Sequence, residues 1–473
     1  MRLKMRYGDP WKIEKAKTAD GVEIEIVVGL NERFWAGAIG KETDLVHCPD
    51  TQAFWNYDQE SGLFVPLSAE GLREIAGMRL FQAASDENRP EVKNLATVNH
   101  LDRIVKAAKG VREHRNFFDG GPQSIHCANG HIREDLTFDS VFSPSYRSRN
   151  RSPYPFHDDA DCPRFREELL QRVLPDKDDR ILMQKIFGLA LLGDNPAQRI
   201  ALLHGPGGAG KGVLLRILRA VVGPDNVCEL RTKHLAERFE INRFVGKSLL
   251  LGSDVPGDFL ECRGAEVLKS LVGGDPLSAE GKGQNTYVTV EGNLNVFIVS
   301  NTRLRCRLDG DVGAWRRRLI LFETKAEPPS KRIPNFEKVL LREEGAGILR
   351  WAVEGFAAAL VDLEETGDLV LTDDQSGRVD DLLMESASLE RFVEVGICKG
   401  SGSLTVDEIE RAFADWCSDR GWSVPPVSRI HRELGDLMLR VHGKPKSNSV
   451  KGDDGKSRRG WRGVHLTEEG DPS

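Results

Sequence analysis

The feature that most constrains the fold of this chain is a glycine-rich segment between an apolar run and an amphipathic stretch. Residues 200–203 are all apolar and are typical of a buried strand. Five glycines follow, and apolar residues then recur at a helical spacing: Gly205, Gly207, Gly208, Gly210 and Gly212, then Val213, Leu214, Ile217, Leu218 and Val221. Glycine lets backbone N–H groups turn inward around an anion, and the start of a helix adds positive potential. The sequence therefore predicts an α/β fold with a phosphate-binding loop.

The loop matches the pattern G-x-x-x-x-G-K-[ST] at every position except the last. Lys211 supplies a full positive charge for the outer phosphates, whereas Gly212 stands where a hydroxyl would normally hold a magnesium ion. We expect a nucleotide to bind along the whole loop, at Gly205, Pro206, Gly207, Gly208, Ala209, Gly210, Lys211 and Gly212. The alternative is a glycine-rich turn before an ordinary helix.

Length and charge set bounds on the rest of the chain. The 473 residues are enough for about three domains of ~150 residues each. The net charge of −7 means that any DNA surface must be a local basic patch. The eight cysteines form no C-x-x-C pair, which disfavours zinc knuckles and a disulfide framework and favours reduced thiols in a cytoplasmic protein. The basic N-terminal residues lack the apolar core of a signal peptide, and no run of about 18 apolar residues predicts a membrane span.

The first hundred residues are expected to form an α+β accessory region. Residues 22–28 alternate as a strand does, and residues 54–66 read as a hairpin with its turn at 58–62. Residues 72–80 and 101–108 have helical character. An archaeo-eukaryotic primase would need a D-x-D pair in this half of the chain, and no such pair occurs before residue 150. Primase activity is therefore disfavoured.

Residues 116–162 read as turns and short strands, and residues 165–192 as a helical collar. The first of these segments carries three arginines near two tyrosines: Arg147, Arg149 and Arg151, with Tyr146 and Tyr154. Such a run can contact nucleic acid through charge and stacking, or it can form a solvated loop, and both interpretations stay open. Three histidines in this region lack a regular metal-ligand spacing and are expected to be ordinary surface or packed residues: His126, His131 and His157.

Two polar residues are expected to reach the loop from neighbouring strands. Residues 247–254 form a β-run that ends in Asp254, where a carboxylate can hold magnesium and orient water. Asp258 is the alternative carboxylate, and an acidic turn residue after a core strand is the simpler interpretation. Residues 294–301 form another buried run, and the amide of Asn301 at its end can bond to the γ-phosphate or to the attacking water.

Two basic segments follow the same region. Lys269 and Lys282 flank a glycine-rich loop that could contact the phosphates of a strand in a pore. Arg316, Arg317 and Arg318 directly precede an apolar strand. Guanidinium groups stabilise the charge on a transferring phosphoryl group, often from a neighbouring subunit. Taken alone, the first segment is a polar hairpin and the second a solvated edge.

The order of these motifs resembles that of the superfamily 3 helicases, and in particular the phage/plasmid primase-helicase family. The ordered segments are 205–211, Asp254, 269–275, 300–301 and 315–318. Flanking segments are similar to the same family: 161–165 and 188–192 before the core, 347–355 after it, and 412–417 and 460–464 near the C-terminus. The likeness covers about residues 115 to 465.

The resemblance implies an AAA+ core that hydrolyses ATP with Mg²⁺, assembles as a homohexamer and translocates on DNA. By position, Lys211 would bind phosphate, Asp254 would serve the metal, and Asn301 would be the sensor. Arg316 or Arg317 would be the finger that reaches the next subunit. Lys269 and Lys282 would contact the single strand in the central channel. The sequence departs from the family at Gly212 and at Asp254, where relatives often carry Glu.

The C-terminal part is expected to be a small winged-helix-like domain that holds duplex DNA. Residues 406–416 and 428–439 are amphipathic helices, and residues 444–462 carry seven basic residues. Lys456, Arg458 and Arg459 are candidates for a wing on the duplex backbone, and a basic loop without that role is the alternative. The expected organisation is an N-terminal α+β region (1–115), a β-hairpin and helical collar (116–195), an AAA+ core (196–325), a helical lid and linker (326–385) and the winged-helix-like domain (386–473).

Two functions remain open from the sequence. The first is an ATP-dependent DNA helicase of a phage, plasmid or mobile element. The second, motivated by Gly212, is a nucleotide-regulated origin-binding or loader protein without strong helicase activity.

Overall fold

The chain forms two compact units in the computed structural model, each described here by itself. The structure describes residues 2–49, 51–261, 264–280, 287–306, 312–451 and 456–467. The first unit comprises Met1–Val255, Glu266–Asn301 and Phe322–Val370, and the second comprises Pro256–Ala265, Thr302–Leu321 and Leu371–Ser473. Two segments of the region 196–325, which the sequence suggested as one core, therefore group with the C-terminal residues.

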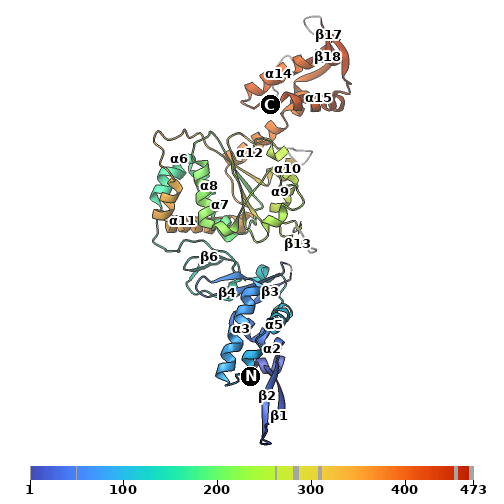
Figure 1. Cartoon of the computed structure of the whole chain (residues 1–473). Helices are drawn as coiled ribbons and strands as arrows, with labels where there is room; N and C mark the ends of the chain where they lie inside the picture. The colour runs from blue at the N-terminus through green and yellow to red at the C-terminus, as the bar shows by residue number, and fades with distance from the viewer. Residues whose placement is uncertain are drawn as a thin grey trace. The chain divides into compact units, whose positions relative to one another are not determined.

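The N-terminal part of the first unit is a small α+β fold (Figure 1). Its elements are α1 (Arg2–Tyr7), β1 (Trp11–Lys17), β2 (Glu23–Leu30), α2 (Glu32–Glu42), β3 (Val46–Cys48), β4 (Ala53–Asp58), β5 (Leu63–Leu67), α3 (Ala69–Asp86), α4 (Val92–Leu95) and α5 (Val98–Val111). The predicted strand at 22–28, the hairpin at 54–66 and both predicted helices are confirmed as β2, β4–β5, α3 and α5. Trp35, Leu72 and Ile104 belong to one apolar core that α2, α3 and α5 bury.

A segment of turns and short strands links this part to the central sheet. Its elements are η1 (Phe117–Gly120), β6 (Ser124–Cys127), β7 (Gly130–Arg133), β8 (Phe138–Asp139) and η2 (Pro144–Tyr146). His126 and His131 lie opposite each other in β6 and β7, and their buried rings stack with centroids 4.0 Å apart. No group of three metal-ligating side chains occurs among the described residues. The structure thus places these two histidines in packing contacts.

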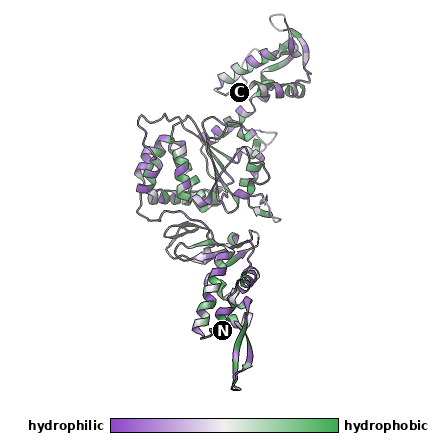
Figure 2. Cartoon of the chain, in the orientation of Figure 1, coloured by the Kyte–Doolittle hydropathy of each residue, from purple (hydrophilic) through white to green (hydrophobic). Residues whose placement is uncertain are grey.

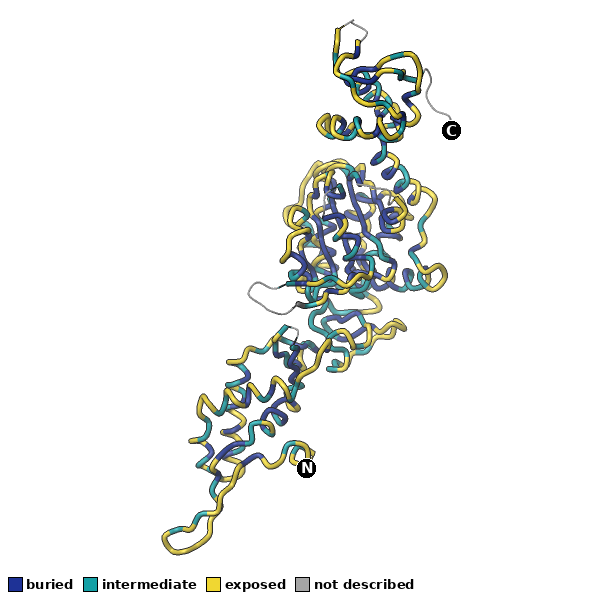
Figure 3. The backbone as a smooth tube through the Cα atoms, turned by 90° about the vertical axis from the view of Figure 1, so that its right-hand side faces the viewer, coloured by how far each residue is buried: buried dark blue, intermediate teal, exposed yellow. Residues whose placement is uncertain are grey.

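The centre of the first unit is a parallel sheet whose inner strands are buried throughout and mainly apolar. The strand order is β10 (Val227–Glu229), β11 (Leu249–Gly252), β14 (Asn295–Ser300), β9 (Ile200–His204) and β15 (Leu319–Glu323). The pairs β10–β11, β11–β14 and β14–β9 are parallel, and every residue of β9, β11 and β14 is buried. Figure 2 shows these strands as hydrophobic and Figure 3 shows them as buried. Strands covered on both faces are expected to be continuous apolar runs, as here.

Helices cover this sheet. They are η3 (Phe165–Leu170, π-helical), α6 (Gln171–Val173), α7 (Lys177–Leu192), α8 (Lys211–Val222), α9 (Gly264–Val272) and α11 (Phe336–Thr366), with short turns η4 (Pro224–Asn226) and η5 (Ile241–Phe244). The short turn η6 (Phe259–Glu261) belongs to the second unit. The predicted helical collar at 165–192 is present as η3, α6 and α7. A two-stranded hairpin joins α9 to β14, formed by β12 (Leu277–Glu280) and β13 (Tyr287–Val290). No described helix has the length and apolarity that crossing a membrane requires.

Glycines allow α7 and α11 to approach closely. A Cβ on Gly188 would lie 2.2 Å from the backbone nitrogen of Phe356, and one on Gly355 would lie 2.0 Å from the carbonyl oxygen of Gln184. Glu344 of α11 accepts hydrogen bonds from the backbone N–H groups of Arg164 and Phe165 at 2.9 and 2.8 Å. These contacts fix the segment that begins at Phe165.

The second unit contains α10 (Val312–Arg316), α12 (Asp373–Ser386) and a small α+β fold. The elements of that fold are α13 (Ser388–Val395), β16 (Ile397–Thr405), α14 (Val406–Asp419), α15 (Val427–His442), β17 (Ser447–Lys451) and β18 (Ser457–Leu466). The strands form one antiparallel sheet in the order β16, β18, β17. Phe413, Trp461 and Met438 lie in its core. The two helices predicted at 406–416 and 428–439 are confirmed as α14 and α15.

Candidate nucleotide-binding site

The loop between β9 and α8 has a backbone that only glycine adopts readily. Gly205, Gly208 and Gly210 have φ values of 146°, 84° and 103°. A Cβ on Gly205 would also lie 2.1 Å from the carbonyl oxygen of Thr324. Side chains are therefore excluded at Gly205 by both conformation and space. The loop follows its predicted course from a buried strand into a helix.

Helix α8 begins at Lys211 with its positive end at the loop. Its N-cap is Gly210, which offers no side-chain oxygen to the first N–H groups of the helix. The buried face of α8 is apolar and includes Leu214, Ile217 and Leu218. A packed helix whose N-terminus carries no capping side chain leaves its first N–H groups to an anion.

Lys211 is buried and forms three hydrogen bonds. Its Nζ donates to the carbonyl oxygens of Gly205 and Pro206 at 2.7 and 2.8 Å, and to Oδ1 of Asn301 at 3.1 Å. Burial lowers the pKa of Lys211, and the nearby Asp254 carboxylate opposes this shift. The ammonium is thus held inside the loop. Two of its three acceptors are backbone carbonyl oxygens of the loop, which a phosphate oxygen could replace.

Asn301 joins Lys211 to Asp254. The Nδ2 of Asn301 donates to Oδ1 of Asp254 at 2.6 Å, while its Oδ1 accepts from Lys211. Asp254 follows β11 and Asn301 follows β14, and these neighbouring strands end at the same edge of the sheet. The structure therefore brings together the three polar residues that the sequence singled out around the loop.

Asp254 has an unusual backbone conformation. Its φ is 53°, in the left-handed region that most side chains avoid but that Asp and Asn tolerate. The next residue is fixed from both sides, because Val255 donates to the carbonyl of Val299 at 2.9 Å and accepts from Oγ of Ser300 at 2.7 Å. Such locally disfavoured conformations persist where the surroundings hold them, often at functional sites.

These residues line a cavity of about 620 Å³ in the first unit. Residues 208–212 form one wall, with Asp254 and Asn301 beside them. Apolar side chains line another part, from η3 and from the segment around the start of α11: Leu169, Ile333 and Phe336. A polar end and an apolar end in one cavity suit a ligand that carries both phosphates and a base.

Four cations also line this cavity, and they fall into two pairs. Arg172 donates to the carbonyl of Glu327, and Arg216 forms an ion pair with Glu337 at 3.1 Å. Lys331 and Arg332 are exposed and have no hydrogen bond or ion pair within the described part of the chain. Nη2 of Arg332 lies 3.8 Å from the point that a Cβ on Gly208 would occupy. These two cations are therefore available to a ligand at the loop.

Sequence reasoning missed Arg332, Lys331 and the apolar residues of the cavity. A Lys-Arg pair shortly after a core strand is a weak local signal that could have pointed to the first two. Leu169 comes from η3 and Phe336 from the start of α11, and contacts between these two distant segments of the sequence bring both side chains to the cavity. No spacing in the sequence encodes that contact.

The two arginines predicted to act on a neighbouring subunit differ in their surroundings. Arg316 forms an ion pair with Asp380 at 2.5 Å inside the second unit. Arg317 is exposed, and no ion pair or side-chain hydrogen bond to another described residue engages it. Arg318 is buried and donates to the carbonyl of Ala314 at 3.2 Å. Of this trio, Arg317 is the side chain that can reach another molecule without first losing a partner.

The residues predicted to contact DNA differ in their exposure and in their ion pairs. Lys269 is buried on α9 and forms an ion pair with Glu266 at 2.9 Å, so its ammonium is not presented to a strand in this arrangement. Lys282 lies outside the described residues. Lys456 and Arg459 are exposed, and Arg458 forms an ion pair with Asp407 at 3.6 Å.

A divalent cation would find two carboxylates along this cavity, Asp254 and Glu168. Glu168 is already paired with Arg164 at 2.7 Å, Gly212 offers no hydroxyl, and Asp258 does not line the cavity. Magnesium is commonly bound through one or two carboxylates together with substrate phosphates and water. The residues present therefore fit a magnesium ion that arrives with a nucleotide.

Comparisons with known proteins concern the central region and the fold of the chain. Residues 203–318 match a family described as a family of unknown function (DUF5906). The chain is similar to the apo structure of the NrS-1 C-terminal region, with a TM-score of 0.51 and 13% sequence identity over 91% of this chain and 99% of that one. The A form apo structure of the same region gives a TM-score of 0.48 and 12% identity over 91% and 99%. At 13% identity, the first of these two likenesses shows a shared fold.

Proposed function

We propose that the chain is a nucleoside triphosphatase that uses ATP to translocate on DNA and separate its strands, as a replication protein of a phage, plasmid or mobile element. The observation that carries the proposal is the hydrogen-bonded series Lys211–Asn301–Asp254 at the mouth of a glycine loop. A cation, an amide and a carboxylate at these places are the groups that hydrolysis of a phosphoanhydride needs.

Each residue of the series has a separate task. On nucleotide binding, Lys211 exchanges the carbonyls of Gly205 and Pro206 for the outer phosphates and neutralises their charge. Asp254 would orient the attacking water and would hold a magnesium ion, which would supply positive charge to the phosphate oxygens. Asn301 contacts both Lys211 and Asp254. The presence or absence of the γ-phosphate at Lys211 can therefore change the contact with Asp254, which follows β11.

The strand order supports an AAA+ core. Strand β14 lies between β9, which leads into the glycine loop, and β11, which ends before Asp254. This order places a second polar residue, Asn301, between the loop and the carboxylate. It is the arrangement that the resemblance to superfamily 3 helicases implies, with Arg332 as an additional cation for the phosphates.

The surroundings of Arg317 support a ring of subunits. Its guanidinium has no partner within the described part of its own chain, and an arginine that stabilises transferring phosphate commonly comes from a neighbour. A homohexamer with a single strand in its centre is the assembly that we propose. From α13 to β18 the order of the described elements is helix, strand, helix, helix, strand, strand, as in winged-helix folds, which supports duplex binding at the C-terminal domain.

The alternative is an origin-binding or loader protein that binds nucleotide without unwinding DNA, and the missing hydroxyl at Gly212 favours it. A strand-separation assay on forked DNA decides between the two. The helicase proposal expects unwinding with ATP and none with a non-hydrolysable analogue. Equal strand separation with both nucleotides, or with neither, would favour the alternative.

A further inference from the structure

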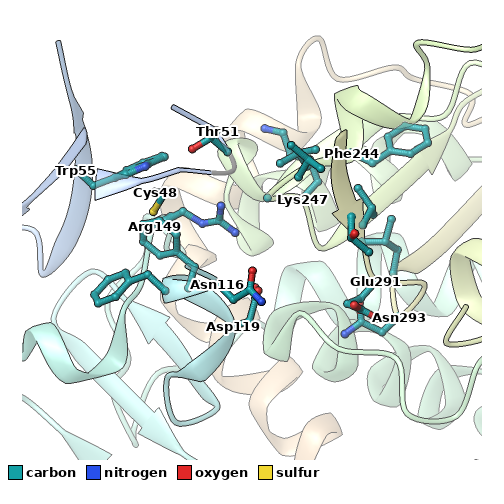
Figure 4. Close-up of a pocket in the computed structure, with 18 residues that line it drawn as sticks. Cys48, Thr51, Trp55, Asn116, Asp119, Arg149, Phe244, Lys247, Glu291 and Asn293 are labelled. Atoms are coloured by element: carbon teal, nitrogen blue, oxygen red, sulfur yellow. The ribbon is translucent and has the colours of Figure 1, made fainter. Parts of the chain in front are cut away.

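A second cavity of the first unit carries hydrogen-bond donors that lack acceptors. Its volume is about 580 Å³, and it shares no lining residue with the nucleotide site. Figure 4 shows Trp55 and Thr51 on one side of this cavity, the guanidinium of Arg149 reaching into it, and Asn293 across from them. Nothing in the proposed hydrolysis uses these residues.

Three of these side chains have donors with no partner. The Nε1 of Trp55 and the Oγ1 of Thr51 are buried and make no hydrogen bond. Arg149 makes no hydrogen bond or ion pair with any residue that the structure describes, and burial lowers the pKa of its guanidinium. Buried donors without acceptors cost free energy, and a native structure that keeps several in one cavity calls for a ligand or water there.

The neighbouring arginines show that Arg149 is exceptional. Arg147 donates to the carbonyl of Phe117 at 2.9 Å, and Arg151 donates to the carbonyl of Ser61 at 2.7 Å. Both guanidinium groups are therefore engaged by backbone carbonyls of the same chain. Arg149 stacks over the ring of Phe118, with Cζ 4.4 Å from the ring centroid, and the nearby Asp119 carboxylate opposes the lowering of its pKa. The basic-aromatic segment that the sequence left open thus contains two arginines bonded to backbone carbonyls and one, Arg149, that makes no hydrogen bond or ion pair within the described residues.

The side chains that line the cavity indicate which kind of ligand it can bind. Donors from Thr51, Trp55 and Arg149 fit a group that is purely an acceptor and negatively charged, such as a phosphoryl group. Aromatic faces lie beside them, since the rings of Trp55 and Phe118 meet edge to face with centroids 5.0 Å apart. Two carboxylates, Asp119 and Glu291, also line the cavity. They disfavour a highly charged triphosphate and are compatible with a single negative charge.

We propose that this cavity binds one phosphodiester of a single-stranded nucleic acid, with Arg149, Thr51 and the Trp55 indole donating to the phosphate and the aromatic rings supporting a neighbouring base. The choice of a strand over a free mononucleotide rests on the function proposed above. All residues that line the cavity belong to the first unit, so it would bind the strand without a contribution from the C-terminal domain.

The test measures equilibrium binding of a fluorescent oligothymidylate to the full chain without ATP, in a Lys211→Ala background. Arg149→Gln should weaken binding several-fold and reduce the slope of log K against log salt by about 0.7, the value for one phosphate contact on a single strand. Arg103→Gln removes an equally basic side chain from the exposed face of α5 and should change neither quantity.

Two further variants separate ligand binding from folding. Thr51→Val and Trp55→Phe each remove one donor that has no partner, so the melting temperature should stay the same or rise while affinity for the oligonucleotide falls. A purely structural role predicts lower stability and unchanged affinity. These variants keep the proposal testable if Arg149→Gln fails to fold.

Competition identifies the source of the phosphate. Thymidine monophosphate and inorganic phosphate should displace the labelled strand only at concentrations far above that of an unlabelled oligonucleotide. The proposal is overturned if all three competitors act equally, or if Arg149→Gln, Thr51→Val and Trp55→Phe all bind as the Arg103→Gln control does. Because no ATP is present, loss of hydrolysis elsewhere cannot mimic either result.

Discussion

The ammonium of Lys211 donates to the amide oxygen of Asn301 over 3.1 Å, although the first residue opens a helix and the second follows a strand. This contact connects the phosphate loop to the carboxylate of Asp254. It links the loop directly to the neighbouring strand, and under the proposed function the loss or gain of a phosphate at Lys211 would change this contact with Asn301.

Gly212→Ser should increase the rate of magnesium-dependent ATP hydrolysis. A Cβ at this position would meet nothing closer than the flexible end of Arg216 at 3.4 Å, so the added hydroxyl has room. It would supply the ligand that phosphate loops of this pattern usually give to magnesium. Steady-state hydrolysis measured across a magnesium titration checks this, and we expect half-saturation at lower magnesium.

Gly210→Ser is the matched control for that change. Gly210 has a φ of 103°, and a Cβ there would lie 2.9 Å from Cγ2 of Val173. The same hydroxyl two positions earlier should therefore reduce hydrolysis. If serine at 212 also lowered activity, the assignment of Gly212 to the metal-facing position would be wrong.

Asp254→Asn should abolish turnover without unfolding the chain. Asn tolerates the left-handed backbone at this position as well as Asp does, and its oxygen can still accept from Asn301. The negative charge that orients water and holds magnesium is lost, and a fall in kcat of about 100-fold or more is expected. Parallel measurements of kcat, nucleotide affinity and melting temperature check this, with only kcat changing strongly. Hydrolysis at the original rate would exclude Asp254 from catalysis.

Arg317→Ala should stop hydrolysis in a way that another subunit can repair. Lys211→Ala subunits lack a working loop but still carry Arg317, so mixing the two inactive variants should restore part of the activity. Arg316→Ala removes the ion pair with Asp380 and should have a smaller effect on turnover. Activity that stays absent in every mixture, while both variants assemble, would contradict a finger that acts between subunits.

Gly355→Ala should destabilise the first unit. The new Cβ would lie 2.0 Å from the carbonyl oxygen of Gln184, so α7 and α11 must separate, at a cost of about 1–3 kcal/mol. Gly110→Ala in α5 is the control, because a Cβ there meets nothing within 4 Å. Chemical denaturation should lower the unfolding free energy only for the first variant. Equal stability of both would mean that the two helices are not packed this closely.

The elements around the loop were predictable because their signals are local. An apolar run and the polar residue at its end, as at Asp254 and Asn301, place a side chain at the edge of a parallel sheet without any knowledge of its neighbours. The helices α14 and α15 likewise follow from their own apolar spacing.

Partners in space were not predictable. The sequence marks Arg316 and Arg317 as cations, but only the fold shows that Asp380, 64 residues further along the chain, engages the first of them. The apolar end of the cavity also escaped prediction, because Leu169 and Phe336 are brought to the loop by the packing of separate helices. The sequence also does not distinguish Arg149 from Arg147 and Arg151, because only the fold shows that the latter two donate to backbone carbonyls.

The central claim is that the glycine loop and Lys211 bind a nucleotide and support its hydrolysis. The most direct measurement is phosphate release from ATP by the full chain, with and without single-stranded DNA, beside the Lys211→Ala variant. We predict hydrolysis that DNA stimulates and that Lys211→Ala eliminates. Hydrolysis that persists in Lys211→Ala, or an intact chain that neither binds nor cleaves ATP, would contradict the account.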